Sequence, residues 1–246
     1  MAEGELDILA IGAHPDDVEM TSGGYMALAA KQGKRVGALH LTKGEMGTRG
    51  TPEERVEEAK AAGRVLGLAS VDFAGLQDGH VQCDDESTAT VVRFLRTLKP
   101  KLVIAPFTIC HHPDHEQAAH IVLRAVHLAG KVKYDTDTEP HVVAGMVHAR
   151  YSHAFEPSYY VDISSVIDIK KEAILCYFSQ FQPKEGEPET RLSNPSFLDQ
   201  LTARGHAYGL ATGVEHAEMY RSVGPLVARD PLSLFLDQAP LSRLAR

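Results

Sequence analysis

The 246-residue sequence contains no tryptophan and only three cysteines, Cys83, Cys110 and Cys176. Such a scattered, odd set argues against a disulfide framework and is typical of a reducing compartment. No apolar run approaches the roughly 20 residues of a membrane span, and the acidic start Met-Ala-Glu-Gly-Glu lacks the basic region of a signal peptide. Positive charge is also scarce, since 25 Lys and Arg against 33 Asp and Glu give a net charge of -8. We therefore expect a cytoplasmic protein that binds neither nucleic acid nor membranes.

Common nucleotide and zinc-protease motifs are missing as well. The first apolar run is followed by Gly12-Ala-His-Pro-Asp-Asp17, which lacks the Gly-x-Gly-x-x-Gly that lets a pyrophosphate approach the backbone. No phosphate-binding Gly-x-x-x-x-Gly-Lys occurs. His115 and His120 lie five positions apart, about 140° around a helix, so they cannot face one ion as the histidines of a zinc-protease helix do.

What is present predicts an α/β fold. Leu6 to Ile11 and Lys101 to Ala105 are short apolar runs, typical of buried strands. The repeated strand-helix order predicts a mostly parallel sheet with right-handed crossovers, hence a Rossmann-like three-layer sandwich. The other elements expected in this half are helices over 18–32, 52–66, 86–98 and 114–129, with strands over 35–41 and 71–73.

The second half is less regular, and we expect it to be a C-terminal elaboration of one domain spanning residues 1–246. The pattern predicts strands over 146–151 and 159–163 and helices over 166–181 and 197–207. Residues 182–195 are polar with three prolines, which predicts an exposed loop. The tail from Gly224 onward has little pattern.

Histidines and carboxylates follow two of the predicted strands at the point where each strand ends. His14, Asp16 and Asp17 follow the first strand, and His112 and His115 follow the fourth. If the strand order is 3-2-1-4, these two strands are neighbours and the crevice between them is the topological switch point, where such sheets bind ligands. We expect the two stretches to face each other.

This arrangement predicts a catalytic zinc site. Zinc in such sites takes three His, Asp or Glu ligands and keeps a position open for water. His14, Asp17 and His115 supply that set for one Zn²⁺ per chain, although Fe(II), Co(II) or Mn(II) also bind two histidines and a carboxylate. Zinc lowers the pKa of bound water to about 7, which generates a nucleophile.

Three further residues are expected to complete the chemistry. Asp16 could take the proton from the water, and a protonated His112 could stabilise the oxyanion or protonate a leaving amine, with Asp114 orienting its ring. Each residue alone has an ordinary structural explanation, such as a helix cap or a solvated turn, but their joint placement after two buried strands favours a metal site. The set predicts hydrolysis of a polarised carbonyl and does not rank amide above ester.

Both stretches resemble the signature motifs of a known family. Ala13-His-Pro-Asp-Asp17 with Glu19, and His112-Pro-Asp-His115, are similar to the two motifs of the LmbE-like (PIG-L) zinc N-deacetylases. The resemblance extends through most of the chain. The bacillithiol branch of the family is similar in further stretches: Leu41-Thr42, Gly50-Thr-Pro-Glu-Glu-Arg55, Glu58-Ala59, Leu66-Gly67, Tyr160-Val-Asp-Ile163, Lys170-x-x-Ala173, Ser179-Gln-Phe181, Ala203-Arg204 and Tyr208-Gly209.

The resemblance implies a zinc-dependent hydrolase that removes the N-acetyl group from an N-acetylglucosamine conjugate. In the bacillithiol branch this substrate is N-acetylglucosaminyl malate, and close relatives form hexamers, so a homo-oligomer is expected. The family's zinc ligands fall on His14, Asp17 and His115, its base on Asp16, and its acid and orienter on His112 and Asp114. The resemblance also implies that Arg55 reaches the substrate and that Asp78 contacts sugar hydroxyls.

One position departs from the branch. Just before the second motif, branch members often place an arginine where this chain has His111. An arginine there would be a fixed cation for an anionic aglycone, whereas a histidine is mostly neutral at pH 7 unless its pKa is raised. An inositol conjugate, a chitooligosaccharide or a related glucosaminide is therefore also a candidate substrate.

Two other classes of function remain. A metal-dependent phosphoesterase would need a second metal about 4 Å from the first, and the sequence supplies one complete ligand set. A non-enzymatic binding protein on the same scaffold would be expected to have lost the acid and base residues, which are present here. Fold alone does not decide between these classes.

Overall fold

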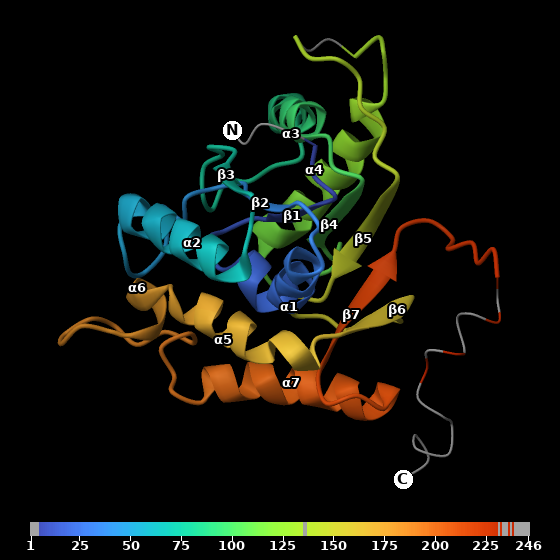
Figure 1. Ribbon diagram of the computed structural model, residues 1–246. Coiled ribbons are helices and arrows are strands. Elements are labelled where there is room, and N and C mark those ends of the chain that lie inside the picture. Colours follow the sequence, from blue (N-terminus) through green and yellow to red (C-terminus); the bar gives the residue numbers. More distant parts are fainter. Residues whose placement is uncertain (1–4, 135–136, 231, 233–235, 237, 239–246) are drawn as a thin grey trace.

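A computed structural model describes residues 5–134 and 137–230, together with residues 232, 236 and 238. Its first half alternates strands and helices (Figure 1). The elements of this half are β1 (Ile8–Gly12), α1 (Asp17–Lys31), β2 (Val36–His40), α2 (Pro52–Leu66), β3 (Ser70–Phe73), α3 (Asp85–Leu98), β4 (Leu102–Pro106) and α4 (Pro113–Ala129). The second half contains β5 (Gly145–Ala149), β6 (Tyr159–Asp162), a 3₁₀ turn (Ser164–Val166), α5 (Ile167–Leu175), α6 (Phe178–Phe181), α7 (Phe197–Thr212) and β7 (Ala217–Ser222).

One seven-stranded sheet organises the molecule, with the order β3-β2-β1-β4-β5-β7-β6. The strands from β3 to β5 are parallel, and β7 runs antiparallel to both β5 and β6. The predicted order 3-2-1-4 and the mostly parallel α/β sheet are therefore confirmed. The loops after β1 and β4 leave the same edge of adjacent strands, which is the switch point where ligands bind in such sheets.

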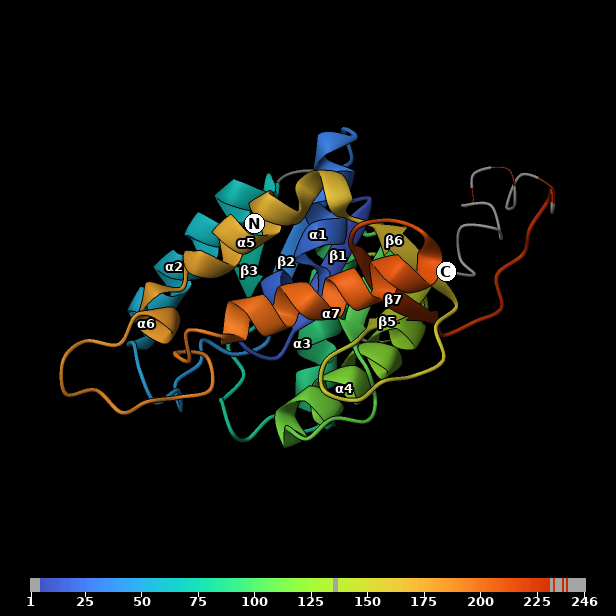
Figure 2. The ribbon, with the colours of Figure 1, turned by 90° about the horizontal axis from the view of Figure 1, so that it is seen from below.

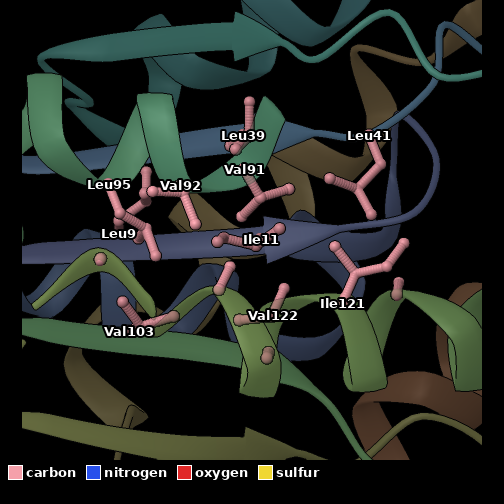
Figure 3. Packing of buried hydrophobic residues seen from close by; sticks show 14 of the residues in the cluster. Leu9, Ile11, Leu39, Leu41, Val91, Val92, Leu95, Val103, Ile121 and Val122 are labelled. Carbon is pink, nitrogen blue, oxygen red and sulfur yellow. The ribbon is translucent and has the colours of Figure 1, made fainter. Parts of the chain in front are cut away.

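Helices cover both faces of the sheet, with α3 and α4 on one side and α1, α2 and α5 on the other (Figures 1 and 2). Alternate residues of β1 supply the two cores, because successive strand side chains point to opposite faces. Leu9 and Ile11 pack with α3 and α4 (Figure 3), whereas Ile8 and Ala10 pack against α1. Since both faces of β1 are buried, the loop that follows it starts from a fixed position.

The predicted helix over 166–181 is wrong in one respect, because the structure divides it into the 3₁₀ turn, α5 and α6. The backbone leaves helical geometry at Tyr177, with φ -83° and ψ 62°, and the Tyr177 ring is fully buried against α2. The next turn is held by α2 as well, since Glu58 accepts hydrogen bonds from the Ser179 amide at 2.6 Å and hydroxyl at 2.7 Å. Tertiary contacts therefore override a continuous helical pattern.

Strand β7 is an element that the sequence pattern does not reveal. Four of its residues, Ala217 to Tyr220, are buried, and one of them is Glu218. A charged residue at a buried position hides the apolar alternation by which strands are recognised. The strand nevertheless joins β5 to β6 and carries the C-terminal elaboration onto the main sheet (Figure 1).

None of the described helices combines the length and apolarity that crossing a membrane would require. The prediction of one domain over residues 1–246 stays a prediction, because residues 1–4, 135–136 and most of 231–246 lie outside the described part of the chain.

Candidate metal centre

The loop after β1 is a tight turn that places three polar side chains at the end of the strand. A Cβ on Gly12 would lie 2.8 Å from the Cβ of Asp17, so the turn has room only for glycine there. The His14 amide donates to Asp17 Oδ2 at 2.8 Å, which fixes that carboxylate. Asp16 has a left-handed backbone (φ 100°) and is the N-cap residue of α1. Non-glycine residues with such a φ are uncommon and are held in place by their surroundings.

Arg55 of α2 supplies that support. Its guanidinium donates to the Pro15 carbonyl at 2.5 Å and to Asp16 Oδ2 at 3.0 Å. Arg55 is only 4% exposed, and it is not among the residues that line the cleft described below. Its described contacts are therefore with the Asp16 turn, and a direct contact with substrate stays a prediction.

The second stretch begins helix α4. His112 is the N-cap residue, and its Nδ1 accepts a hydrogen bond from the Asp114 amide at 3.3 Å. The first turn of the helix then directs His115 toward β1, because the two loops leave adjacent strands. His115 Nε2 lies 3.2 Å from His14 Nδ1 and 3.2 Å from Asp17 Oδ1.

His14, Asp17 and His115 therefore bring three donor atoms together, and each of these atoms lies within 4.8 Å of the others. Two imidazole nitrogens and one carboxylate oxygen are a typical ligand set for catalytic zinc. Asp17 and His115 also line an open cleft, so an ion here would keep a position free for a further ligand. The residues present thus fit a divalent metal with one open side.

The other nitrogen of His14 faces two carboxylates. His14 Nε2 lies 3.0 Å from Asp78 Oδ1 and 3.3 Å from Asp114 Oδ2. Metal-binding histidines usually donate their second N–H to a carboxylate, which fixes the tautomer and leaves the first nitrogen free for the metal. This contact would leave His14 Nδ1, on the Asp17 side, as the nitrogen free to bind a metal.

Charge at the centre favours a cation. Burial lowers the pKa of His14, but Asp114, Asp17 and Asp78 outweigh it and hold that pKa well above its usual range. Burial likewise opposes the raised pKa of His115, which Asp17 brings to about 9. In the absence of metal both rings would therefore be positively charged imidazolium ions at pH 7. A metal ion would displace a proton from each ring and take the place of that positive charge beside the carboxylates.

Two of the carboxylates at the centre, Asp16 and Asp78, have pKa values shifted in opposite directions. Burial raises the pKa of Asp16 to about 6, against the opposing effect of Arg55. Burial also acts on Asp78, but the hydrogen bond from His14 prevails and lowers its pKa to about 2. Asp16 is thus the carboxylate of the centre whose proton affinity lies nearest to neutral pH.

Three predicted site residues lie in positions that the sequence could not specify. Asp78 is 5% exposed, and besides His14 it accepts a hydrogen bond from the Met46 amide at 2.8 Å. The carboxylate of Asp114 contacts His14 and the Gly79 amide, at 2.8 Å from the amide, so its described link to His112 is through the backbone. His111 is exposed at the edge of the cleft, with its ring 4.4 Å from that of His153.

The cleft beside the metal centre has a volume of about 680 Å³, which is in the range of small-molecule sites. Part of its lining consists of residues to which sequence reasoning gives no role. Arg150 follows the end of β5, so the strand-end rule that found the metal centre could also have found it. The loop before α7 and α7 itself offer no such signal. The missed lining residues include Arg150, Tyr151, Ser152, Arg191 and Arg204.

Comparisons with known proteins point to one family. Residues 9–126 match the family described as GlcNAc-PI de-N-acetylase (PIG-L). The diacetylchitobiose deacetylase of Thermococcus kodakarensis is 30% identical over 191 residues, which cover 71% of this chain and 70% of that protein. A probable N-acetyl-α-D-glucosaminyl L-malate deacetylase of Bacillus subtilis is 28% identical over 76% of this chain and 89% of its own length.

Two further similarities set the range of the family. A 4-oxalmesaconate hydratase of Pseudomonas putida is 29% identical over 70% of this chain and 73% of that protein. The crystal structure of the conserved protein TT1542 from Thermus thermophilus superposes with a TM-score of 0.84 at 37% identity, covering 92% of this chain and 98% of that one. The resemblance thus includes the C-terminal elaboration as well as the two motifs.

Proposed function

Since the chain belongs to the GlcNAc-PI de-N-acetylase (PIG-L) family and is similar to named deacetylases, we propose that it hydrolyses the acetamide of an N-acetylglucosamine conjugate. The observation that carries the proposal is the convergence of His14, Asp17 and His115 at the cleft, with the buried Asp16 beside them. The products are acetate and the free amine.

A divalent ion, for which zinc fits best, would lie between His14 Nδ1, Asp17 and His115 Nε2. It would supply Lewis acidity at the acetyl carbonyl and lower the pKa of water. The chain's own residues provide the remaining steps. Asp16 is held through Oδ2 by Arg55, and its pKa of about 6 leaves it mostly ionised at pH 7. It can therefore accept the proton of the attacking water.

His112 has a role complementary to that of the base Asp16, because it donates a hydrogen bond where Asp16 accepts a proton. Burial, and then the nearby His14 and His115, lower the pKa of His112, so at pH 7 the ring is mostly neutral. Its Nδ1 accepts from the Asp114 amide, which places the ring proton on Nε2. In this form Nε2–H donates a hydrogen bond to the developing oxyanion, while the proton that Asp16 accepted from the water passes to the leaving amine as the C–N bond breaks.

The finer part of the proposal concerns the substrate. We infer N-acetylglucosaminyl malate, the bacillithiol precursor, because the chain is similar to the malate deacetylase of Bacillus subtilis over most of both sequences. An inositol conjugate and a chitooligosaccharide are the alternatives, each represented by a named relative. A cytoplasmic location and a homo-oligomer, such as the hexamer of the bacillithiol branch, belong to the same proposal.

A two-metal phosphoesterase is less well supported. His14, His112 and Asp114 form a second candidate ligand group, but it shares His14 with the first group. The His14 nitrogen that faces Asp114 is Nε2, and its contacts with Asp78 and Asp114 suit a donated N–H. The single-metal deacetylase uses every one of these contacts without conflict.

The test is acetate release by the purified protein from three substrates, namely N-acetylglucosaminyl malate, the inositol conjugate and diacetylchitobiose. Each is measured before chelation, after chelation and after zinc is added back. We expect turnover that disappears with the metal and returns with zinc. Absence of acetate from all three substrates with a folded, zinc-loaded sample would overturn the proposal, and water addition to 4-oxalmesaconate by that sample would replace it with a hydratase.

A further inference from the structure

Three arginines of the second half of the chain line the cleft beside the metal centre, and we call this group the arginine wall. Arg150 follows β5, Arg191 lies in the loop before α7, and Arg204 belongs to α7. All three line the same cleft as Asp17 and His115. Three segments that are far apart in the sequence thus each contribute an arginine to this cleft.

The charge of this cleft is opposite to that of the protein as a whole. The chain carries a formal net charge of -8, yet Asp17 is the one acidic residue among the described residues that line the cleft. Asp17 belongs to the proposed metal ligand set, so a bound ion would take up its charge. Apart from Asp17, no described residue that lines the cleft supplies a carboxylate to the three arginines.

Each arginine is anchored by neutral groups. Arg150 donates to the Tyr208 hydroxyl and lies over that ring, 5.6 Å from its centroid, while its buried Nε has no partner among the described residues. Arg204 donates to the Tyr151 carbonyl at 3.2 Å. Arg191 lies over the Phe197 ring at 5.5 Å. Within the described residues, none of the three has a carboxylate at ion-pair distance.

The nearest candidate counter-ion is already engaged. Glu218 accepts hydrogen bonds from Lys170 Nζ at 2.5 Å, from the Tyr220 hydroxyl at 2.7 Å and from two backbone amides of α1. Burial, and then the neighbouring Arg150, lower the pKa of Arg204 to about 10, although Glu218 acts to raise it. Partly buried cations that repel one another are costly unless an anion joins them.

We propose that Arg150, Arg191 and Arg204 form a subsite for an anionic group, a carboxylate or a phosphate, on the aglycone of the substrate. Guanidinium groups bind such oxyanions in a bidentate way, and their fixed charge does not depend on pH near neutrality. The subsite rests on the proposed function, because it takes the acetamide to lie at the metal centre. It also removes the need for an arginine at His111, since the three arginines bring positive charge to the same cleft.

The kinetic test compares two substrates that differ only in charge, N-acetylglucosaminyl malate and its dimethyl ester, with a phosphate-bearing glucosaminide as the third. We expect the wild-type zinc enzyme to show a KM about 10- to 100-fold lower for the acid than for the ester. The variants Arg204→Gln and Arg191→Gln should raise the KM of the acid while leaving kcat, and the KM of the ester, nearly unchanged. Arg204→Lys should restore part of the preference because it keeps the charge.

The matched control is Arg221→Gln, which removes the same charge from β7. Arg221 is exposed, lies over Phe107 at 5.9 Å and does not line the cleft. It should leave the acid preference intact. Equal KM values for acid and ester in the wild type, or a preference that survives Arg191→Gln/Arg204→Gln together, would overturn the subsite while leaving the deacetylase intact.

A binding measurement decides the subsite even if no glucosaminide is turned over. Calorimetric titration of the zinc-loaded protein with malate and with inorganic phosphate should show binding that weakens at least about tenfold in the double variant and not in Arg221→Gln. Tighter phosphate binding would identify a phosphate-bearing aglycone, and tighter malate binding a carboxylate. Identical affinities in wild type, double variant and control would refute the anionic subsite.

Discussion

The metal centre and the arginine wall of the cleft (Arg150, Arg191 and Arg204) are built in different ways. At the metal centre nearly every polar group has a protein partner: Arg55 holds Asp16, the His14 amide holds Asp17, and two carboxylates face His14 Nε2. At the arginine wall the cations have only neutral partners among the described residues. Under the proposed function, the first region is preorganised for chemistry and the second would be completed by the anionic group of the substrate. Reaction type and substrate choice would then depend on separate parts of the chain.

The strongest test of this division is His115→Ala. The variant removes one of three ligand atoms, so we expect loss of stoichiometric metal and of turnover together. The measurement is zinc content of the purified protein alongside acetate release. His120→Ala is the matched control, because His120 lies exposed on the same helix. Full zinc content in His115→Ala would contradict the ligand set.

The next largest effect is expected from Asp16→Asn. Asparagine keeps the size of the side chain and leaves the three ligands in place, so metal should be retained. Without the base, kcat should fall by about 10²- to 10⁴-fold, the usual contribution of a positioned general base. Zinc content and kcat are measured on the same sample, and a kcat near that of the wild type would remove Asp16 from the mechanism.

The difference in how these two regions are encoded also explains what the sequence could predict. The metal centre is encoded in two short stretches that each follow a buried strand, so local pattern and sheet topology together locate it. Arg191 and Arg204 follow no strand end, so this rule does not find them, and the match of Ala203-Arg204 to the bacillithiol branch gives Arg204 no role. Helix α7, which carries Arg204, packs against β7. That strand is hidden in the sequence by the buried Glu218.

Tertiary packing also explains where other details of the structure go beyond the sequence pattern. The predicted continuous helix over 166–181 breaks at Tyr177, where the ring is buried against α2 and the following turn is held by Glu58. For Asp78 and Asp114 the sequence predicts roles at the sugar and at His112, which stay predictions, while the structure adds contacts of both carboxylates with His14 Nε2. Side-chain partners across 100 residues of sequence depend on packing that no local pattern contains.

A third prediction concerns pH and metal affinity. The raised pKa values of His14 and His115 mean that both rings hold protons in the metal-free protein at pH 7, and these protons must leave before the nitrogens can bind an ion. Zinc affinity should therefore rise with pH between 6 and 8, by up to about tenfold per unit for each proton displaced. Competition titrations with a chelator at several pH values measure it, and a flat profile would contradict these protonation states.

The smallest effect on turnover is expected in the C-terminal elaboration, from Lys170→Met. Lys170 and Glu218 form a buried ion pair at 2.5 Å that links α5 to β7, and Glu218 also accepts from the Gly24 and Tyr25 amides of α1. Removing the lysine leaves a buried charge with one partner fewer, so the free energy of unfolding should fall by about 3–5 kcal/mol. The metal centre makes no contact with this pair, and kcat per folded molecule should not change.

Denaturant unfolding of the zinc-loaded protein measures the loss, with kcat determined under conditions where the variant is fully folded. The double variant Lys170→Met/Glu218→Gln removes both charges and should recover part of the stability, because replacing a whole buried pair is tolerated better than breaking it. A large fall in kcat for Lys170→Met, with stability unchanged, would show that the elaboration takes part in the chemistry. Reaction type and substrate choice would then not depend on separate parts of the chain.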